Sequence, residues 1–398
     1  MGYSKHPLRG TWSRNDHHRS RKAGLAILLM LLGISTLVQG CSELKPRVIV
    51  VVDPYANIDW SSFGQYKANL HTHTTQSDGS LTPDQVIDEY HKRGYSILAI
   101  TDHNLCTWPW TGFADMPRRG AARKSDVEAE EKEDAPAPYP PYENRDPEAL
   151  GMLAVSGNEL SRHHHMGCFF IEHETDSRDE DRSMVEIGEK GGLAMLYHPG
   201  RYWKVCEHNT IPAEVVKRYV DWLAAYEHLV GLEVVNQGRR YQNDIRLWDE
   251  VLTAMMPDRP VWGFSNDDMH GRGQLGRDWN TFVLVRLDEA ELREALRGGQ
   301  FYFSTIGTHP GESRNVAETP IIHSITHNHR AGTITLTATS GGEPLPETQY
   351  RWISEGRVVH TGPVLDYLRR DGIGRYVRAE LVGNGGTTYT NPVGLRHP

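Results

Sequence analysis

Short, almost continuously apolar runs alternate along most of the chain with stretches whose apolar residues recur every three or four positions. The runs include YSILAITDH, GLAMLYHPG and LVGLEVVNQ, and the intervening stretches include PAEVVKRYVDWLAAYEHL and DEAELREALRGG. Strands that are apolar on both faces are typical of parallel sheets covered by helices. We therefore expect an α/β fold, and seven or eight such strands favour a barrel over an open sheet.

The first helix of this pattern has clear start and stop signals. Thr82 is a predicted N-cap, Pro83 occupies the first helical position, and Gln85 completes a capping box. Gly94 follows as a stop signal. We expect the helix to lie between these residues.

The pattern changes near residue 318. The segments GTITLTATS, QYRWISEGRVVH and GRYVRAELVG alternate apolar and polar residues, and no helical pattern separates them. This alternation is typical of antiparallel strands with one buried face. We expect a small all-β, sandwich-like domain over residues 318–398, with a role in packing or recognition because it holds no cluster of potential ligands.

The first 41 residues have the pattern of an export signal. Basic residues precede the apolar run LAILLMLLGISTLV, which is short for a membrane-spanning helix, and the segment ends in LVQGC. The ending resembles a bacterial lipoprotein signal with Cys41 as the lipidated residue; a retained membrane anchor is the alternative. Both interpretations place the protein in the periplasm or at the cell surface, tethered to the membrane, with residues 42–64 as the tether.

Residues 118–147 combine dense charge and proline with few apolar side chains. A segment of this composition buries little surface, so we expect a mobile insertion beside the strand ends. It is either a solvated loop or a lid over a site.

Charge and cysteine content exclude two classes of function. The formal charge of −9, with no basic block outside the N-terminus, argues against a protein that coats duplex nucleic acid. It leaves a small phosphate-bearing substrate open. None of the four cysteines shows CxxC spacing, which argues against a thiolate zinc site.

Histidines and carboxylates cluster after the apolar runs, at the ends of strands where parallel α/β folds build their sites. His71 and His73 end one run, and side chains two positions apart on a strand point to the same side. The remaining candidates are Asp78, His103, Glu159, His164, His165, His198, Asp268 and His270. Imidazole and carboxylate ligands suit Zn, Mn or Fe, and their number exceeds the need of one ion. We expect two or three divalent ions.

Four motifs follow one another along the chain: NLHTHTTQSDGSLTPDQVIDEYHKRGYSILAITDHN, SGNELS, YHPGR and SNDDMH. Together and in this order they resemble the PHP (polymerase and histidinol phosphatase) family of metal-dependent phosphoesterases. The resemblance covers roughly residues 66–307. It implies a distorted (β/α)7 barrel, which we place over residues 65–312, with a di- or trinuclear site at the carboxyl ends of the strands.

The resemblance also implies a role for each candidate ligand. His71 and His73 would bind one ion, Asp78 and His103 another, and Glu159 would bridge. The shells would be completed by His198, Asp268 and His270. The histidine of the fourth strand is either His164 or His165, with a slight preference for His165.

The expected reaction follows from the ions. A hydroxide held between two ions is a nucleophile at neutral pH and would attack the phosphorus of a phosphomonoester or phosphodiester. Arg201 in HPGR is the candidate cation for the charge on the phosphate oxygens; a surface arginine is the alternative. Two other functions stay open: hydrolysis of a C–N or C–O bond by the same ions, and a non-catalytic surface binding protein.

Overall fold

The computed structural model describes residues 48–117, 141–175, 177–205, 210–238, 240–306 and 315–398, which belong to one unit of the chain. The predicted leader with Cys41, residues 42–47 of the tether and residues 118–140 of the insertion lie outside the described residues. None of the described helices is both long and apolar enough to cross a bilayer.

One sheet carries the central part of the chain, with its strands side by side in sequence order. They are β5 (Gly157–Leu160), β6 (Met166–Phe169), β7 (Leu193–Leu196), β8 (Leu229–Asn236) and β9 (Trp262–Asn266). The pairs β7–β8 and β8–β9 are parallel, whereas β6 is antiparallel to both of its neighbours. Every residue of these strands is buried, which explains the apolar runs of β6, β7 and β8.

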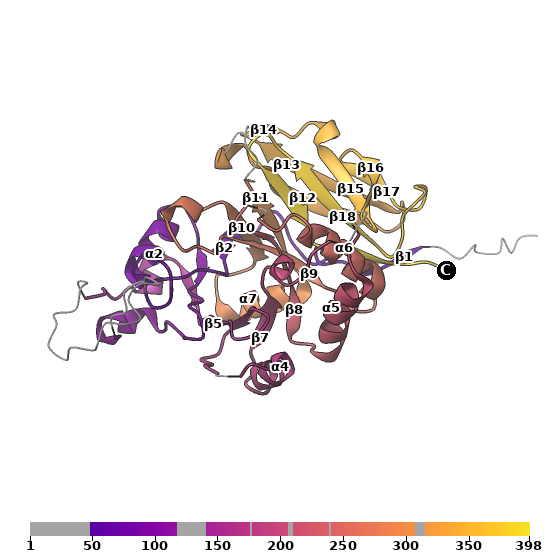
Figure 1. The fold of residues 1–398 in the computed structure, drawn as a ribbon. Coiled ribbons are helices and arrows are strands. Elements are labelled where there is room, and N and C mark those ends of the chain that lie inside the picture. Colours follow the sequence, from indigo (N-terminus) through magenta and orange to yellow (C-terminus); the bar gives the residue numbers. More distant parts are fainter. Residues whose placement is uncertain (1–47, 118–140, 176, 206–209, 239, 307–314) are drawn as a thin grey trace, which may run out of the picture. The chain divides into compact units, whose positions relative to one another are not determined.

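Helices connect and cover these strands. The helices α4 (Glu180–Glu189), α5 (Ala213–Ala225) and α6 (Asp244–Met255) fall between successive strands, and Figure 1 shows α5 and α6 beside β8 and β9. The other helices are α2 (Pro83–His91), α3 (Pro147–Leu150) and α7 (Glu289–Gly298). Short 3-10 helices are η1 (Trp110–Asp115), η2 (Pro199–Arg201), η4 (Arg272–Gln274), η5 (Val316–Glu318) and η6 (Glu347–Gln349).

A second, eleven-stranded sheet joins strands from both ends of the described chain. Its main path is β1 (Ile49–Val52), β20 (Val393–Arg396), β18 (Tyr376–Val382), β19 (Thr387–Thr390), β11 (Phe301–Thr305), β10 (Asp278–Leu284), β2 (Gly64–Asn69), β3 (Ile97–Ala99) and β4 (Leu153–Val155). Off this path, β15 (Tyr350–Ser354) pairs with β16 (Arg357–Thr361) and with β18. The C-terminal strands therefore continue the sheet that contains β2 and β3.

The third sheet contains β12 (Ile321–Asn328), β13 (Thr333–Ser340), β14 (Glu343–Pro344) and β17 (Val364–Asp366), all in antiparallel pairs. Figure 1 shows these strands in the yellow, C-terminal part of the chain. The predicted α/β class and β-rich C-terminal region are thus confirmed. A closed seven-stranded barrel and an independent C-terminal domain stay predictions.

The first helix begins as the sequence predicts. The Thr82 N–H donates to Gln85 Oε1 at 3.2 Å, and Pro83 is the first residue of α2. The helix ends at His91, and Gly94 follows with a φ of 73°, a conformation that favours glycine.

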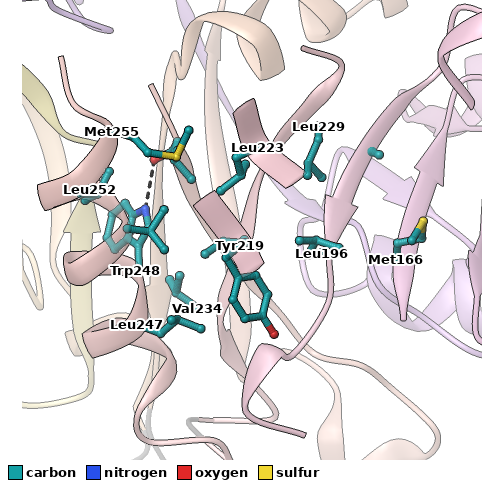
Figure 2. Packing of buried hydrophobic residues seen from close by; sticks show 14 of the residues in the cluster. Met166, Leu196, Tyr219, Leu223, Leu229, Val234, Leu247, Trp248, Leu252 and Met255 are labelled. Carbon is teal, nitrogen blue, oxygen red and sulfur yellow. Dashed lines mark hydrogen bonds between the residues drawn. The ribbon is translucent and has the colours of Figure 1, made fainter. Parts of the chain in front are cut away.

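Two helices anchor the strands that carry the site. Figure 2 shows Tyr219 and Leu223 of α5 and Trp248 of α6 packed among buried strand residues such as Leu196 and Val234. The Trp248 Nε1–H donates to the Val261 carbonyl at 3.0 Å. Burying each large apolar side chain stabilises the fold by about 1.5–3 kcal/mol, so this cluster fixes the positions of the strands that carry the site.

Candidate metal centre

The predicted ligands lie where strands end. His71 and His73 follow β2. Between them, Thr72 forms an isolated parallel β-bridge with Met269. A second bridge joins His103 to Glu159. The other candidates follow or precede later strands: His165 precedes β6, His198 follows β7, and Asp268 and His270 follow β9. Segments distant in sequence thereby converge at one place.

The first of three subsites is formed by two imidazoles and two carboxylates. His71 Nε2 lies 3.5 Å from Glu159 Oε1 and 3.3 Å from Asp268 Oδ1. His73 Nε2 lies 3.3 Å from Glu159 Oε2 and 3.3 Å from Asp268 Oδ1. All four side chains are buried. This is the donor set of a divalent-ion site with nitrogen and oxygen ligands.

The second subsite uses Glu159 again. Its Oε1 lies 2.7 Å from His165 Nδ1 and 3.4 Å from His198 Nε2. A carboxylate shared between two sets of imidazoles can bridge two ions.

The third subsite centres on Asp78, the most exposed member. Its Oδ2 lies 3.4 Å from His103 Nε2 and 3.3 Å from His270 Nε2. His103 Nδ1 lies 2.8 Å from Glu159 Oε2, so this subsite adjoins the other two. Asp78 is therefore placed as a potential ligand and not only as a turn residue.

Several ligand atoms are buried and make no hydrogen bond within the described part of the chain. They are Nε2 of His71 and His73, Nδ1 of His103, and Oε2 of Glu159. Buried polar atoms without partners cost free energy, so atoms aimed at a common centre fit ligands arranged around ions. The residues present thus suit the ions that the sequence predicts.

Burial and neighbouring charges shift the pKa values of residues at this centre. Burial raises the pKa of the Glu159 carboxyl, but the surrounding imidazoles, His71 first, hold it well below its usual range. Burial lowers the pKa of His103, but Asp78 and Glu159 overcome this and raise it to about 10. A protonated His103 ring cannot coordinate an ion, so an ion that binds there must displace its proton.

The structure separates His164 from His165. His165 faces Glu159, whereas His164 Nε2 lies 2.8 Å from the Tyr219 hydroxyl and His164 Nδ1 lies 3.0 Å from the His165 carbonyl. Burial holds the pKa of His164 well below its usual range, which fits a neutral ring that donates from Nδ1 and accepts at Nε2. The geometry favours His165 as the ligand.

Replacing each of these histidines in turn tests this choice. We expect His165→Ala to lower the metal content of the purified chain by about one ion and His164→Ala to leave it unchanged, because only His165 faces the bridging carboxylate. Elemental analysis after dialysis measures both. Loss of metal from the His164 variant alone would reverse the assignment.

Glu233 is a residue that sequence reasoning missed. It lies in β8 and is fully buried. The His71 Nδ1–H donates to its Oε1 at 2.9 Å, and the His198 backbone N–H donates to its Oε2 at 2.9 Å. Asn266 and Asn236 each donate one further hydrogen bond at 3.0 Å. The available signal was a lone ionisable residue within the apolar run LVGLEVVN.

A cavity of about 310 Å³ opens onto the three subsites. Arg201, the cation predicted from the sequence, lines it together with Arg240, which the sequence did not single out. The cavity therefore combines potential metal ligands with cations that can meet an anion.

Comparison with known proteins gives two curated relatives. A 3′,5′-nucleoside bisphosphate phosphatase from Chromobacterium violaceum is 25% identical over 269 residues, which is 53% of this chain and 89% of the relative. The DNA polymerase/3′-5′ exonuclease PolX from Bacillus subtilis is 39% identical over 54 residues, only 13% of this chain and 10% of the relative. No protein-family model matches the chain.

Among solved structures, the similar proteins include a two-domain protein from Bacteroides vulgatus that contains a predicted PHP-like metal-dependent phosphoesterase. It aligns with a TM-score of 0.44 and 16% identity, covering 86% of this chain and 98% of that chain. The chain is thus similar to a protein named as a nucleoside bisphosphate phosphatase and to one described as containing a predicted PHP-like metal-dependent phosphoesterase, in agreement with the resemblance of its motifs.

Proposed function

We propose that the protein is a metal-dependent phosphoesterase that hydrolyses a small phosphomonoester or phosphodiester. The observation that carries this proposal is one cavity in which a cluster of six imidazoles and three carboxylates, with four overlapping groups that could each hold an ion, meets Arg201 and Arg240. The relative from Chromobacterium violaceum, whose name describes a bisphosphate phosphatase, supports a small phosphate ester as the substrate.

Different side chains would hold the ions at the different subsites. Glu159 bridges subsites, and Asp268 and Asp78 serve the first and third subsites. The imidazoles that complete the set belong to His71, His73, His103, His165, His198 and His270. Two or three ions of Zn, Mn or Fe, when bound, supply Lewis acidity and lower the pKa of a water molecule that acts as the nucleophile.

Arg201 has a separate role in this proposal. Its backbone is fixed in η2, where its N–H donates to the His198 carbonyl at 3.0 Å. Arg201 lines the cavity beside the ligands, where its guanidinium would neutralise charge on the phosphate oxygens. Because this charge grows as the P–O bond breaks, Arg201 would stabilise the transition state more than the bound substrate.

Hydrolysis of aryl phosphates by the metal-loaded full chain tests the function. We expect measurable turnover, and we expect Arg201→Ala to lower kcat by about 10²-fold, as loss of a charge-stabilising donor does elsewhere. Arg218→Ala, on the exposed face of α5, is the matched control. A metal-loaded chain that cuts no phosphate ester would disprove the proposal, and turnover of amides instead would favour the C–N alternative.

For the fold, we propose that strands from the segment between β2 and β11 close into the distorted seven-stranded barrel. Asn280 of β10 supports closure, since its side chain donates to the Ser265 carbonyl of β9 at 2.9 Å and accepts from the Ser265 N–H at 3.1 Å. An experimental structure in which β9 and β10 lie apart would contradict it.

We further propose that the protein is exported and tethered by a lipid on Cys41. The order of basic residues, apolar run and LVQGC supports this. Labelling with radioactive palmitate should mark the native chain and not a Cys41→Ser variant. Equal membrane association without label in either form would indicate a retained anchor instead.

A further inference from the structure

Gln237 follows β8 directly, and its side chain contacts the potential ligand Asp268, which follows β9. The Gln237 Nε2 donates to the Asp268 carbonyl at 2.9 Å and to Asp268 Oδ2 at 3.1 Å. Its Oε1 accepts from Arg240 Nη1 at 3.2 Å. Arg240 lines the cavity of the metal centre. One amide group thus connects a potential metal ligand with a cation of the same cavity.

The charges on either side fix the orientation of the Gln237 amide. In the reverse orientation, its NH₂ group would face the Arg240 guanidinium and its oxygen would face the Asp268 carboxylate. A guanidinium only donates hydrogen bonds and a carboxylate only accepts them, so both contacts would be lost. Gln237 can therefore serve its two partners in one orientation only.

The two carboxylate oxygens of Asp268 have different surroundings. Oδ2 accepts hydrogen bonds from Gln237 at 3.1 Å and from the Asn236 amide at 3.2 Å. Oδ1 lies 3.3 Å from Nε2 of both His71 and His73. Because the Asp268 side chain is buried, these contacts leave Oδ1 as the oxygen that faces the first subsite.

The backbone at this contact adopts a conformation that favours glycine. The φ angle is 45° at Gln237 and 43° at Asp268. Such values are uncommon for other residues and are retained where surrounding contacts require them. A glycine at position 237 would relieve the backbone but would have no amide side chain to donate. The glutamine at this position therefore indicates a requirement for its side chain.

Resting on the metal centre of the proposed function, we infer that Gln237 is a positioning residue. It holds Asp268 so that Oδ1 alone faces the first subsite, and it holds Arg240 at the cavity, where an anion would bind. Both effects are binding constants that can be measured without turnover. They hold or fail independently of whether the chain cuts a phosphate ester.

Two substitutions separate the amide from the backbone. Gln237→Gly relieves the φ of 45°, Gln237→Met keeps the length of the side chain, and both remove the amide hydrogen bonds. We expect each to raise the apparent Kd for Mn about 10–100-fold, the usual cost of losing a group that orients a ligand. Competition with a chelator measures this Kd in the full chain in detergent. Wild-type affinity in either variant would overturn the inference.

Denaturant unfolding of the metal-free chain distinguishes positioning from stability. Since glycine adopts a φ of 45° readily, the unfolding midpoint of Gln237→Gly should stay close to the wild-type value. A lower midpoint with an unchanged Kd for Mn would assign Gln237 to the stability of the turn. A Kd that rises only in the less stable of the two variants would do the same, and either result would overturn the inference.

Inorganic phosphate probes the contact with Arg240. At saturating Mn, calorimetry should find phosphate binding weakened about tenfold by Gln237→Met and by Arg240→Ala, and no further by the double variant, since the two residues act as one unit. Gln242→Met is the matched control, because this exposed glutamine lies in the same segment and should change neither Kd. Additive losses in the double variant, or no phosphate binding by the unchanged chain, would overturn this second role of Gln237.

Discussion

Replacing Glu159 with alanine is expected to abolish metal binding and hydrolysis together. The Glu159 carboxylate lies within 3.5 Å of five imidazoles, those of His71, His73, His103, His165 and His198. No other described carboxylate contacts as many potential ligands. Its loss removes the group shared by two subsites and leaves clustered imidazoles with less negative charge to offset the ions.

The expected size of the effect follows from this central position. Residues that only orient a ligand cost about 10–100-fold when lost, so the bridging ligand should cost about 10³-fold or more in kcat/KM. Elemental analysis of the dialysed variant should find less than one ion per chain. Glu214→Gln on the exposed part of α5 serves as the control for charge removal. A Glu159→Ala chain with full metal content would show that Glu159 is not a bridging ligand.

The class of the fold could be predicted because burial on both faces leaves a direct signature. All residues of β8 are buried, and the run LVGLEVVN is correspondingly apolar. The sequence pattern did not indicate which strands would pair with one another. The segment GRYVRAELVG alternates like part of a separate antiparallel sheet, yet it forms β18, which pairs with β19. Strand β19 in turn pairs with β11, and the Tyr389 ring stacks on the Phe303 ring at 5.2 Å between centroids. Alternation identifies a buried face but not the strand that will cover it.

The predicted ligands converge because strand ends share one edge of the sheets. The choice between His164 and His165 could not be made in this way, since both precede β6 in a turn without strand alternation. The role of Asp102 also could not be predicted from its position beside His103 in the sequence. Its carboxylate accepts hydrogen bonds from the Thr74 N–H at 2.7 Å and from the Ser77 hydroxyl at 2.6 Å. It thereby fixes the loop that carries Asp78.

Glu233 and Arg240 were missed because their roles depend on packing. The sequence LVGLEVVN does not show that Glu233 faces His71. A parallel strand buried on both faces has no alternation of apolar and polar residues, so the direction of its glutamate cannot be predicted from the pattern. Arg240 acts through the turn after β8, where its N–H donates to the Asn236 carbonyl at 2.8 Å. The position of such a turn relative to a cavity is a property of the assembled fold.

Replacing Glu233 with glutamine is expected to weaken metal binding about 10–100-fold without removing any ligand. Each carboxylate oxygen accepts two hydrogen bonds: Oε1 from His71 and Asn266, and Oε2 from His198 and Asn236. An amide of the same size puts an NH₂ group against two of these donors in either orientation. The His71 ring, which is held with Nε2 toward the first subsite, then loses its fixed tautomer or its orientation.

Two measurements separate this positioning role from a general loss of stability. The apparent Kd for Zn or Mn, obtained by competition with a chelator, should rise about 10–100-fold in Glu233→Gln. Denaturant unfolding of the metal-free chain should show a smaller free energy of unfolding, by about 1–3 kcal/mol, since buried donors lose their acceptor. Glu227→Gln, an exposed change just before β8, should alter neither. A destabilised Glu233 variant with unchanged metal affinity would mean that Glu233 supports the fold and does not orient His71.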